Sequence, residues 1–287
     1  MRFAITMSLA ALVACSSAAF ADDETPPVVG GKTYVQHQIL AAAKRHPEIV
    51  GITVFGKRPE DKGPVVLGST ESVGNVFKPA PDATDGASAA GRYFVVNEPF
   101  LSSTEHRLGT IQIRFRNLPG RTSQYQKIAE EVQARMARDT LSLKNAADPY
   151  PFDPAFGPNT YAQKLTERTI AAHPDILVMM IHATPPKGAH NVIIGSNIGR
   201  FGKQADDDDL RVIDKGSTNL EVGGDNDRYE TELPLLDRSG KRIGALGLVF
   251  RLKAGTDKEA LHRHGLAIRD EVARGIPTNA ALFARTN

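Results

Sequence analysis

The sequence predicts an α+β fold with two repeated domains, each an antiparallel sheet flanked by N- and C-terminal helices. The main observation is an internal repeat, since HPEIV at 46–50 returns as HPDIL at 173–177, a separation of 173 − 46 = 127 residues. In both copies, short apolar runs bounded by turn residues follow this motif, and a long stretch of helix formers closes the copy. A period of this length is too long for a solenoid repeat, so each copy should have its own core.

The repeat extends well beyond the first motif. The same separation pairs Tyr34 with Tyr161 and places VVLGS at 65–69 over VIIGS at 192–196. Later landmarks match at 234 − 99 = 135, where Pro99 pairs with Pro234. The segment between the two sets of landmarks therefore differs in length by 135 − 127 = 8 residues.

Each copy is expected to begin with a helix that a proline ends. The first helix is predicted over 35–44 and stops at His46 and Pro47, because proline disfavours helical backbone in the residue before it. The same stop recurs at His173 and Pro174. Apolar and turn patterns then predict strands over 49–55, 65–69, 93–101 and 108–116, with their counterparts over 176–182, 192–196, 229–236 and 242–251.

Helices complete each copy. Long helices are predicted over 123–143 and 257–274, and the four aspartates Asp206 to Asp209 predict the start of a short helix. Acidic side chains suit that position because they accept hydrogen bonds from the free amides of a first helical turn. A calcium loop is the alternative, but consecutive acids lack its alternating spacing.

The two faces of the predicted sheets differ between the copies. Strand alternation places Ile52 and Val54 on one face, matched by Met179 and Ile181, and this face is apolar in both copies. On the opposite face, the last strand carries Thr110, Gln112 and Arg114 in the first copy and Ala245, Gly247 and Val249 in the second. This face is where binding pockets in the two copies would differ in their lining residues. A solvent-exposed face in the first copy explains the pattern equally well.

The ends and the middle of the chain set the expected boundaries. Residues 1–21 are predicted to be a signal peptide, with an apolar stretch over 3–14 and small residues at Ala19 and Ala21. A flexible leader at 22–31, a first domain at 32–147, a Pro-rich linker at 148–158 and a second domain at 159–287 follow. We expect a periplasmic or secreted protein. The alternative is a lipoprotein anchored through Cys15, because LVAC at 12–15 resembles a lipoprotein cleavage box.

Composition limits the possible functions. The net charge is only +2 and there is no tryptophan, which argues against a nucleic-acid surface. Cys15 is the only cysteine, so an internal disulfide and a cysteine nucleophile in the mature chain are excluded. The sequence contains no GxSxG, HExxH, GxxxxGK[ST] or GxGxxG motif. We therefore expect a protein that is not an enzyme, although a dispersed catalytic triad would leave no local motif.

The second copy carries the motifs of a known family: GSN at 195–197, Gly199 with Arg200, Gly202 with Lys203, YETELPLLD at 229–237 and GKRIGALG at 240–247. With these motifs the chain resembles the extracytoplasmic sensor domains of the Cache class, which are relatives of the PAS fold. The resemblance implies a pocket for a small metabolite in each copy, and signalling through a membrane receptor or sensor kinase. The first copy lacks the acidic helix start and a clean Gly-Arg element, so its pocket is expected to be degenerate.

The candidate binding residues lie in the second copy. Arg200, Lys203 and Arg211 form a cationic set suited to a carboxylate or phosphate, so the predicted ligand is anionic or zwitterionic. The resemblance adds Arg228, Tyr229 and Glu230, at the start of a strand, as ligand contacts, and His182 is placed on the pocket floor. The alternative is that the cations pair with the four aspartates and that Arg228 and Tyr229 are sheet-surface residues.

No metal or other cofactor is expected. His182 and His190 flank a predicted hairpin loop, but two histidines without a third ligand do not make a metal site. His262 and His264 lie two apart on a helix and point in different directions, while His173 suits a helix end. Two other functions stay open: a hydrolase or lyase that uses His182 or His190 as a general base, and an interaction module that recruits a membrane receptor.

Overall fold

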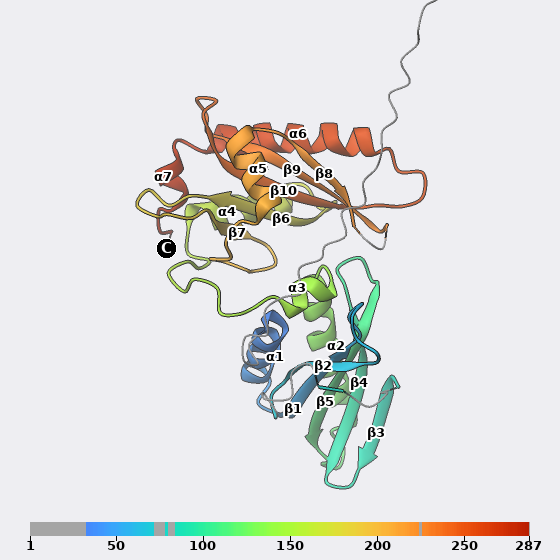
Figure 1. Cartoon of the computed structure of the whole chain (residues 1–287). Coiled ribbons are helices and arrows are strands. Elements are labelled where there is room, and N and C mark those ends of the chain that lie inside the picture. Colours follow the sequence, from blue (N-terminus) through green and yellow to red (C-terminus); the bar gives the residue numbers. More distant parts are fainter. Residues whose placement is uncertain (1–32, 72–77, 80–83, 224–225, 287) are drawn as a thin grey trace, which may run out of the picture.

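The chain folds into a mixed α+β structure with two five-stranded antiparallel sheets (Figure 1). The computed structural model describes residues 33–71, 78–79, 84–223 and 226–286. The predicted signal peptide, the leader at 22–31 and Cys15 lie outside the described residues. None of the helices in the described part is long and apolar enough to cross a membrane.

The first sheet has the strand order β2-β1-β5-β4-β3. Its strands are β1 (Ile49–Gly56), β2 (Val65–Ser69), β3 (Gly86–Ala90), β4 (Tyr93–Leu101) and β5 (Arg107–Arg116). Its helices are α1 (Tyr34–Arg45), α2 (Thr122–Arg138) and α3 (Leu143–Ala147). The helix α1 begins where the Thr33 side chain accepts a hydrogen bond from the Gln36 amide, and it ends at His46 before Pro47.

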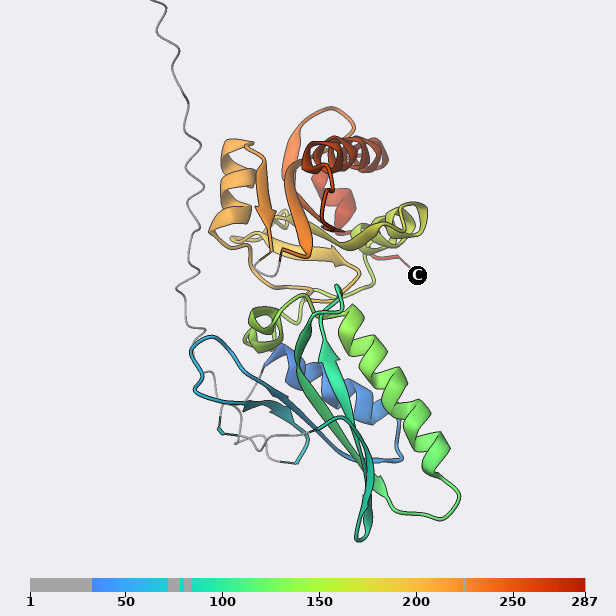
Figure 2. The same cartoon turned by 90° about the vertical axis from the view of Figure 1, so that its right-hand side faces the viewer.

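The second sheet has the equivalent order β7-β6-β10-β9-β8. Its strands are β6 (Ile176–Ala183), β7 (Val192–Ser196), β8 (Asn219–Val222), β9 (Arg228–Leu236) and β10 (Arg242–Arg251). Its helices are α4 (Tyr161–Ala172), α5 (Asp207–Lys215), α6 (Lys258–Gly275) and α7 (Asn279–Leu282). The helix α5 lies on one face of this sheet, and α4 and α6 lie on the other (Figure 2).

Each sheet buries the face that the alternation of the sequence predicts. Ile52, Val54, Ile111, Ile113 and Phe115 are fully buried in the first core against α1 and α2. Their counterparts Met179, Ile181, Leu246, Leu248 and Phe250 are equally buried in the second core against α4 and α6. The prediction of an apolar face packed against helices is therefore confirmed.

Two edge strands, the helix predicted over 123–143 and the short helix α7 differ from the prediction. The edge strands β3 and β8 were not predicted, because GASAA at 86–90 is small and fully exposed and NLEV at 219–222 is short and mostly polar. The helix predicted over 123–143 ends at Arg138, and a separate short helix α3 begins where the Ser142 side chain accepts a hydrogen bond from the Asn145 amide.

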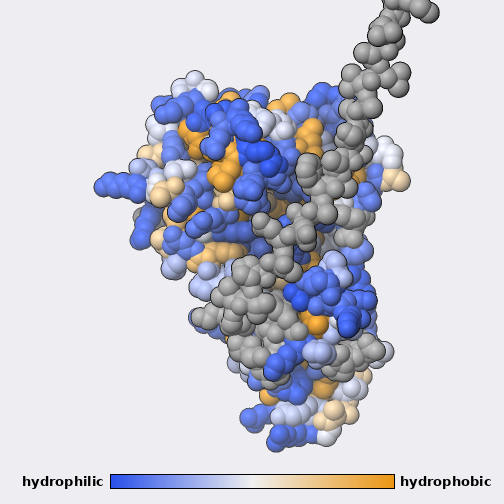
Figure 3. Space-filling view, in the orientation of Figure 1, coloured by the Kyte–Doolittle hydropathy of each residue, from blue (hydrophilic) through white to orange (hydrophobic). Residues whose placement is uncertain are grey.

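The two sheets and their helices contact each other through polar groups and through the apolar side chain of Leu141. The Tyr34 hydroxyl donates to the Ile198 carbonyl, and Thr104 donates to Asp227. Leu141 also joins the apolar side chains Val178, Met180, Ile193, Ile198 and Val249 of the second sheet and its loops. The surface seen in the orientation of Figure 1 is mostly hydrophilic, with apolar residues scattered in small groups, as on many protein surfaces (Figure 3).

Candidate functional site

The candidate site is the face of the second sheet that α5 partly covers. Direct pairing across antiparallel strands places Met180, Gly247, Glu232 and Asn219 in one row on this face. A neighbouring row contains Val178, Val249, Glu230 and Glu221, and the row on the other side contains His182, Ala245 and Pro234. We call Glu230, Glu232, His182 and Asp209 of α5 the acidic face.

Glycine keeps the centre of this face open. A Cβ atom added to Gly247 would lie 3.6 Å from the Met180 methyl group and 3.9 Å from Glu230 Oε1, which are ordinary van der Waals contacts. The Glu230 carboxylate therefore reaches across the backbone of β10 beside it. A residue with a long side chain at position 247 would occupy the space in front of both glutamates.

Glu230 and Glu232 lie close to other carboxylates. Burial and the nearby Glu221 and Asp209 raise the pKa of Glu230 to about 7, while the guanidinium group of Arg228 opposes that shift. Burial and the neighbouring Glu230 raise the pKa of Glu232 well above its ordinary value, although Asn219 donates a hydrogen bond of 3.2 Å to its carboxylate. Among the residues that the structure describes, no basic side chain lies within 4.0 Å of either carboxylate. This surrounding favours a bound cation over an anion.

His182 lies at the border of the acidic face. It is only 3% exposed, and its Nδ1 atom lies 3.5 Å from Asp209 Oδ2 without forming a hydrogen bond. Burial lowers the pKa of His182 while Asp209 opposes that shift. Burial also raises the pKa of Asp209, whose carboxylate accepts a hydrogen bond from the Asp206 amide in the capping box of α5. The ring is therefore neutral at pH 7, with a buried nitrogen that has no partner.

The predicted cations Arg200 and Lys203 lie together but already have a partner. Arg200 forms a buried ion pair with Asp148, and Lys203 Nζ lies 3.4 Å from the same carboxylate. Burial and the adjacent Arg200 lower the pKa of Lys203. Both cations lie near enough to His182 to lower its pKa. The Nε atom of Arg200 is buried without a hydrogen bond.

The remaining predicted residues lie elsewhere. Arg211 is on the exposed side of α5 and pairs with Asp208, as the alternative interpretation of this charge set expected. Tyr229 is 5% exposed and pairs with Phe250 on the opposite face of the sheet, which α6 covers. Arg228 reaches the Leu141 carbonyl at 3.5 Å, and His190 is exposed. The structure thus brings together His182, Arg200 and Lys203 and places Arg228 near Glu230, on the same face of β9, but it does not bring Arg211 and Tyr229 to this face.

Sequence reasoning missed Glu232 and Asp209 as site residues, and it left Glu230 open as either a ligand contact or a sheet-surface residue. The signal was present in the strand alternation of 229–236, which places Glu230 and Glu232 on the face opposite Tyr229. The cationic residues drew attention instead, because their pairing with Asp148 cannot be seen in the sequence. Two acids on one face of a predicted strand were the stronger indication of a binding site.

Two hollows in the surface lie away from the acidic face. One, of about 530 Å³, is bordered by Glu48, Arg116 and Arg121 near the end of α1. The other, of about 290 Å³, lies between the two halves and is bordered by Arg45, Arg135 and Ser196. Neither hollow contains the unpaired carboxylates of the second sheet.

Comparison with known proteins adds little to this geometry. No protein-family model matches the sequence, and no curated protein matches it. Among solved structures, the chain is similar to a protein from Burkholderia vietnamiensis assigned as a GAF sensor. The match has 15% identity and a TM-score of 0.30, and covers 42% of this chain and 76% of that one. Since a likeness this distant carries no argument about function, the site rests on its own residues.

Proposed function

We propose that this chain is an exported small-molecule-binding protein of the sensor type, with two Cache/PAS-like domains. Its ligand is a zwitterion that carries a protonated amine, bound non-covalently at the acidic face of the second sheet. The observation that carries the proposal is the pair of half-buried carboxyl groups on Glu230 and Glu232, which lie beside each other and, among the described residues, form no ion pair within 4.0 Å. An ammonium group would stabilise the ionised form of both carboxyl groups, which the folded chain by itself disfavours.

The other groups suit the remaining parts of such a ligand. The Nδ1 atom of His182, which is buried without a hydrogen bond near charges of both signs, offers a hydrogen-bond position to a ligand. Lys203 is shared with Asp148, and 29% of its side chain is exposed, so it can meet a ligand carboxylate. The amine would then lie toward Glu230 and the carboxylate toward Lys203.

The first sheet lacks these groups. Its corresponding positions are Val95 and Asn97 in β4 and Phe55 in β1, which replace both carboxylates and the histidine. Glu71, the acid near this face, already pairs with Arg114. We therefore assign the amine-binding role to the second sheet alone.

Binding of an amine should strengthen as the pH rises through about 7. The ammonium group needs ionised carboxylates, and the pKa of Glu230 lies at about 7 in the free protein. Titration calorimetry in two buffers with different ionisation enthalpies should show that binding releases protons from the protein. Affinity that is constant from pH 6 to pH 8 would contradict the role of Glu230.

A thermal-shift screen tests the proposed class of ligand. The panel should contain zwitterionic amino acids, simple amines, dicarboxylates and neutral sugars, each tested on the full mature chain. We expect stabilisation by amines and not by dicarboxylates. Replacing Gly247 with Leu should abolish the response by filling the space before Glu230, whereas the matched Gln112→Leu substitution in β5 should preserve it. Stabilisation by dicarboxylates alone would overturn the proposal.

The short distance between His182 and Asp209 favours a second candidate, a hydrolase or lyase with His182 as general base. A carboxylate beside a neutral histidine can orient it for proton transfer. The second histidine of that hypothesis, His190, is exposed on the loop before β7. The double substitution of His182 and His190 by Ala should abolish turnover of a bound amine if the chain is an enzyme, and should largely retain binding if it is not.

A further inference from the structure

We propose that the second half of the chain binds a divalent metal ion of the zinc type through His173, Asp175 and His264. One potential ligand atom from each of these residues lies within 4.8 Å of the other two. The cluster lies beside α6, on the side of the sheet opposite the acidic face, so it does not depend on the proposed small-molecule ligand.

The local fold explains how the three residues meet. His173 caps the C-terminal end of α4, Pro174 turns the chain, and Asp175 comes directly before β6. His264 lies in the middle of α6, where its ring packs 5.7 Å from Phe250 of the core and 5.7 Å from the ring of His173. Two helices and a proline turn therefore hold the three side chains in place.

The distances suit a small tetrahedral ion. His264 Nε2 lies 3.1 Å from Asp175 Oδ2. Two ligands bound to zinc at about 2.0–2.1 Å in a tetrahedron lie about 3.4 Å apart, so this pair needs only a small adjustment, and the atom of His173, within 4.8 Å of both, would move closer. Imidazole and carboxylate are a ligand set that zinc accepts readily, and a water molecule would supply the fourth position.

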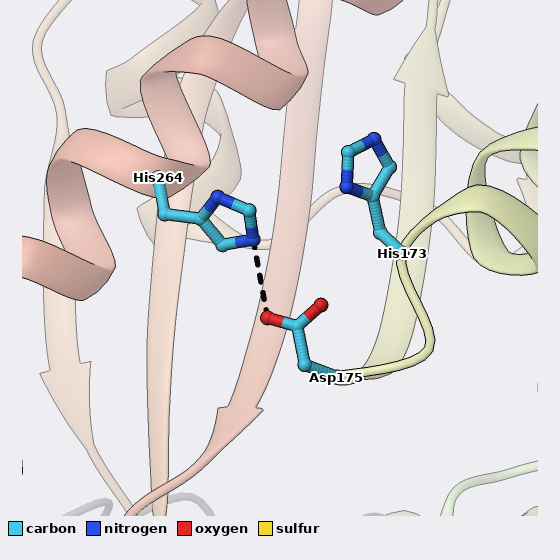
Figure 4. A group of neighbouring side chains, drawn as sticks. All are labelled: His173, Asp175 and His264. Carbon is cyan, nitrogen blue, oxygen red and sulfur yellow. Dashed lines mark ion pairs between the residues drawn. The ribbon is translucent and has the colours of Figure 1, made fainter.

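A carboxylate also orients His173. Its Nε2 atom lies 3.0 Å from Glu271 Oε2, which leaves Nδ1 as the atom for the metal. Figure 4 shows that Nδ1 faces His264 and Asp175. Histidines that bind metals commonly donate their other ring N–H to a carboxylate, which fixes the ring orientation and raises its basicity. Glu271 makes that contact from the same helix as His264.

The site is reachable from solvent. The exposed fractions of the side chains are 21% for His173, 38% for His264 and 54% for Asp175. An ion can therefore bind without opening the core. Once bound, it would join the turn after α4 to α6 and stabilise the second half.

The first half provides an internal comparison. His46 and Glu48 take the places of His173 and Asp175, at the same separation of 127 residues. On α2, however, Gln124 donates a hydrogen bond of 3.5 Å to Glu48, so an amide side chain contacts the acid where the second half presents a histidine. We therefore expect one metal ion per chain rather than two.

The test is titration of the untagged, metal-free, full mature chain with Zn²⁺, by calorimetry and by thermal unfolding. We expect one ion per chain and a higher midpoint of unfolding in its presence. His264→Ala should weaken binding at least tenfold, and Glu271→Gln should weaken it about tenfold through the orientation of His173. His262→Ala is the matched control, because residues two apart on a helix point in different directions, and it should bind like the wild type.

Unfolding of the metal-free variants and X-ray absorption of the zinc-loaded protein distinguish a lost metal ligand from a lost fold. Before titration, the metal-free variants should unfold within a few degrees of the wild type, which separates lost ligation from lost folding. X-ray absorption of the zinc-loaded wild type should show nitrogen and oxygen ligands with the outer-shell scattering of imidazole. Absence of saturable binding by the wild type, or an equal loss in His264→Ala and His262→Ala, would overturn the proposal.

Discussion

At the scale of single residues, Glu230 costs stability in the ligand-free protein. Its pKa is about 7 in the folded chain and near 4.5 when exposed, so the folded state holds the proton more tightly. Its contribution is fully favourable below pH 4.5 and is lost as the pH rises through 7. Glu230→Gln should therefore leave the free energy of unfolding unchanged at pH 4 and increase it by about 1–3 kcal/mol at pH 8.

Urea unfolding of both proteins across this pH range checks that prediction. The wild-type curve should fall from pH 4.5 to pH 8 more steeply than the curve of Glu230→Gln. The control is Gln112→Ala in β5, because this substitution changes a polar side chain of the first sheet without adding a charge. A variant that is less stable than the wild type at pH 8 would show that Glu230 already has a favourable partner.

At the scale of elements, the start of α5 fixes one wall of the acidic face. Asp206 accepts a hydrogen bond from the Asp209 amide, and Asp209 accepts one from the Asp206 amide. Asp206→Ala should therefore lower the free energy of unfolding by about 1 kcal/mol, as the loss of an N-cap does. Asp207→Ala, at the first position of the same helix, is the control and should have a smaller effect in the same unfolding experiment.

The helices and strands were largely predictable because the internal repeat gives each pattern in two copies. The proline after His46 and His173 located the end of the first helix of each copy. Apolar and alternating patterns located four strands of each copy. The acidic start of α5 was predicted as the structure shows it. The strands β3 and β8 were missed because their side chains are mostly exposed, so their sequences need not be apolar, whereas the opposite edge strands β2 and β7 are fully buried and were predicted. The metal cluster was missed because His173 and His264 meet only through tertiary packing.

At the scale of the whole molecule, Asp148 joins the two halves. It follows α3, its backbone carbonyl accepts from the Tyr34 amide, and its carboxylate pairs with Arg200 and Lys203 of the second half. Because the pair with Arg200 is buried, removal of one partner leaves an uncompensated charge. We expect Asp148→Ala to lower the free energy of unfolding by about 3–5 kcal/mol.

Denaturant unfolding with a matched control measures this link. Asp208→Ala breaks the exposed pair with Arg211 and should cost less than about 1 kcal/mol. The Asp148 variant should also separate the unfolding of the two halves into two transitions. If both variants cost the same, the buried pair does not hold the halves together.

The most direct test of the central claim is native mass spectrometry of the protein purified from the cells that produce it. The wild type should carry one small molecule per chain, and the released mass should correspond to a compound with an amine. Glu230→Gln combined with Glu232→Gln should remove that mass, while Gln112→Ala should retain it. A bare wild-type chain, or an extra mass that survives the double substitution, would contradict the assignment of the acidic face as the binding site.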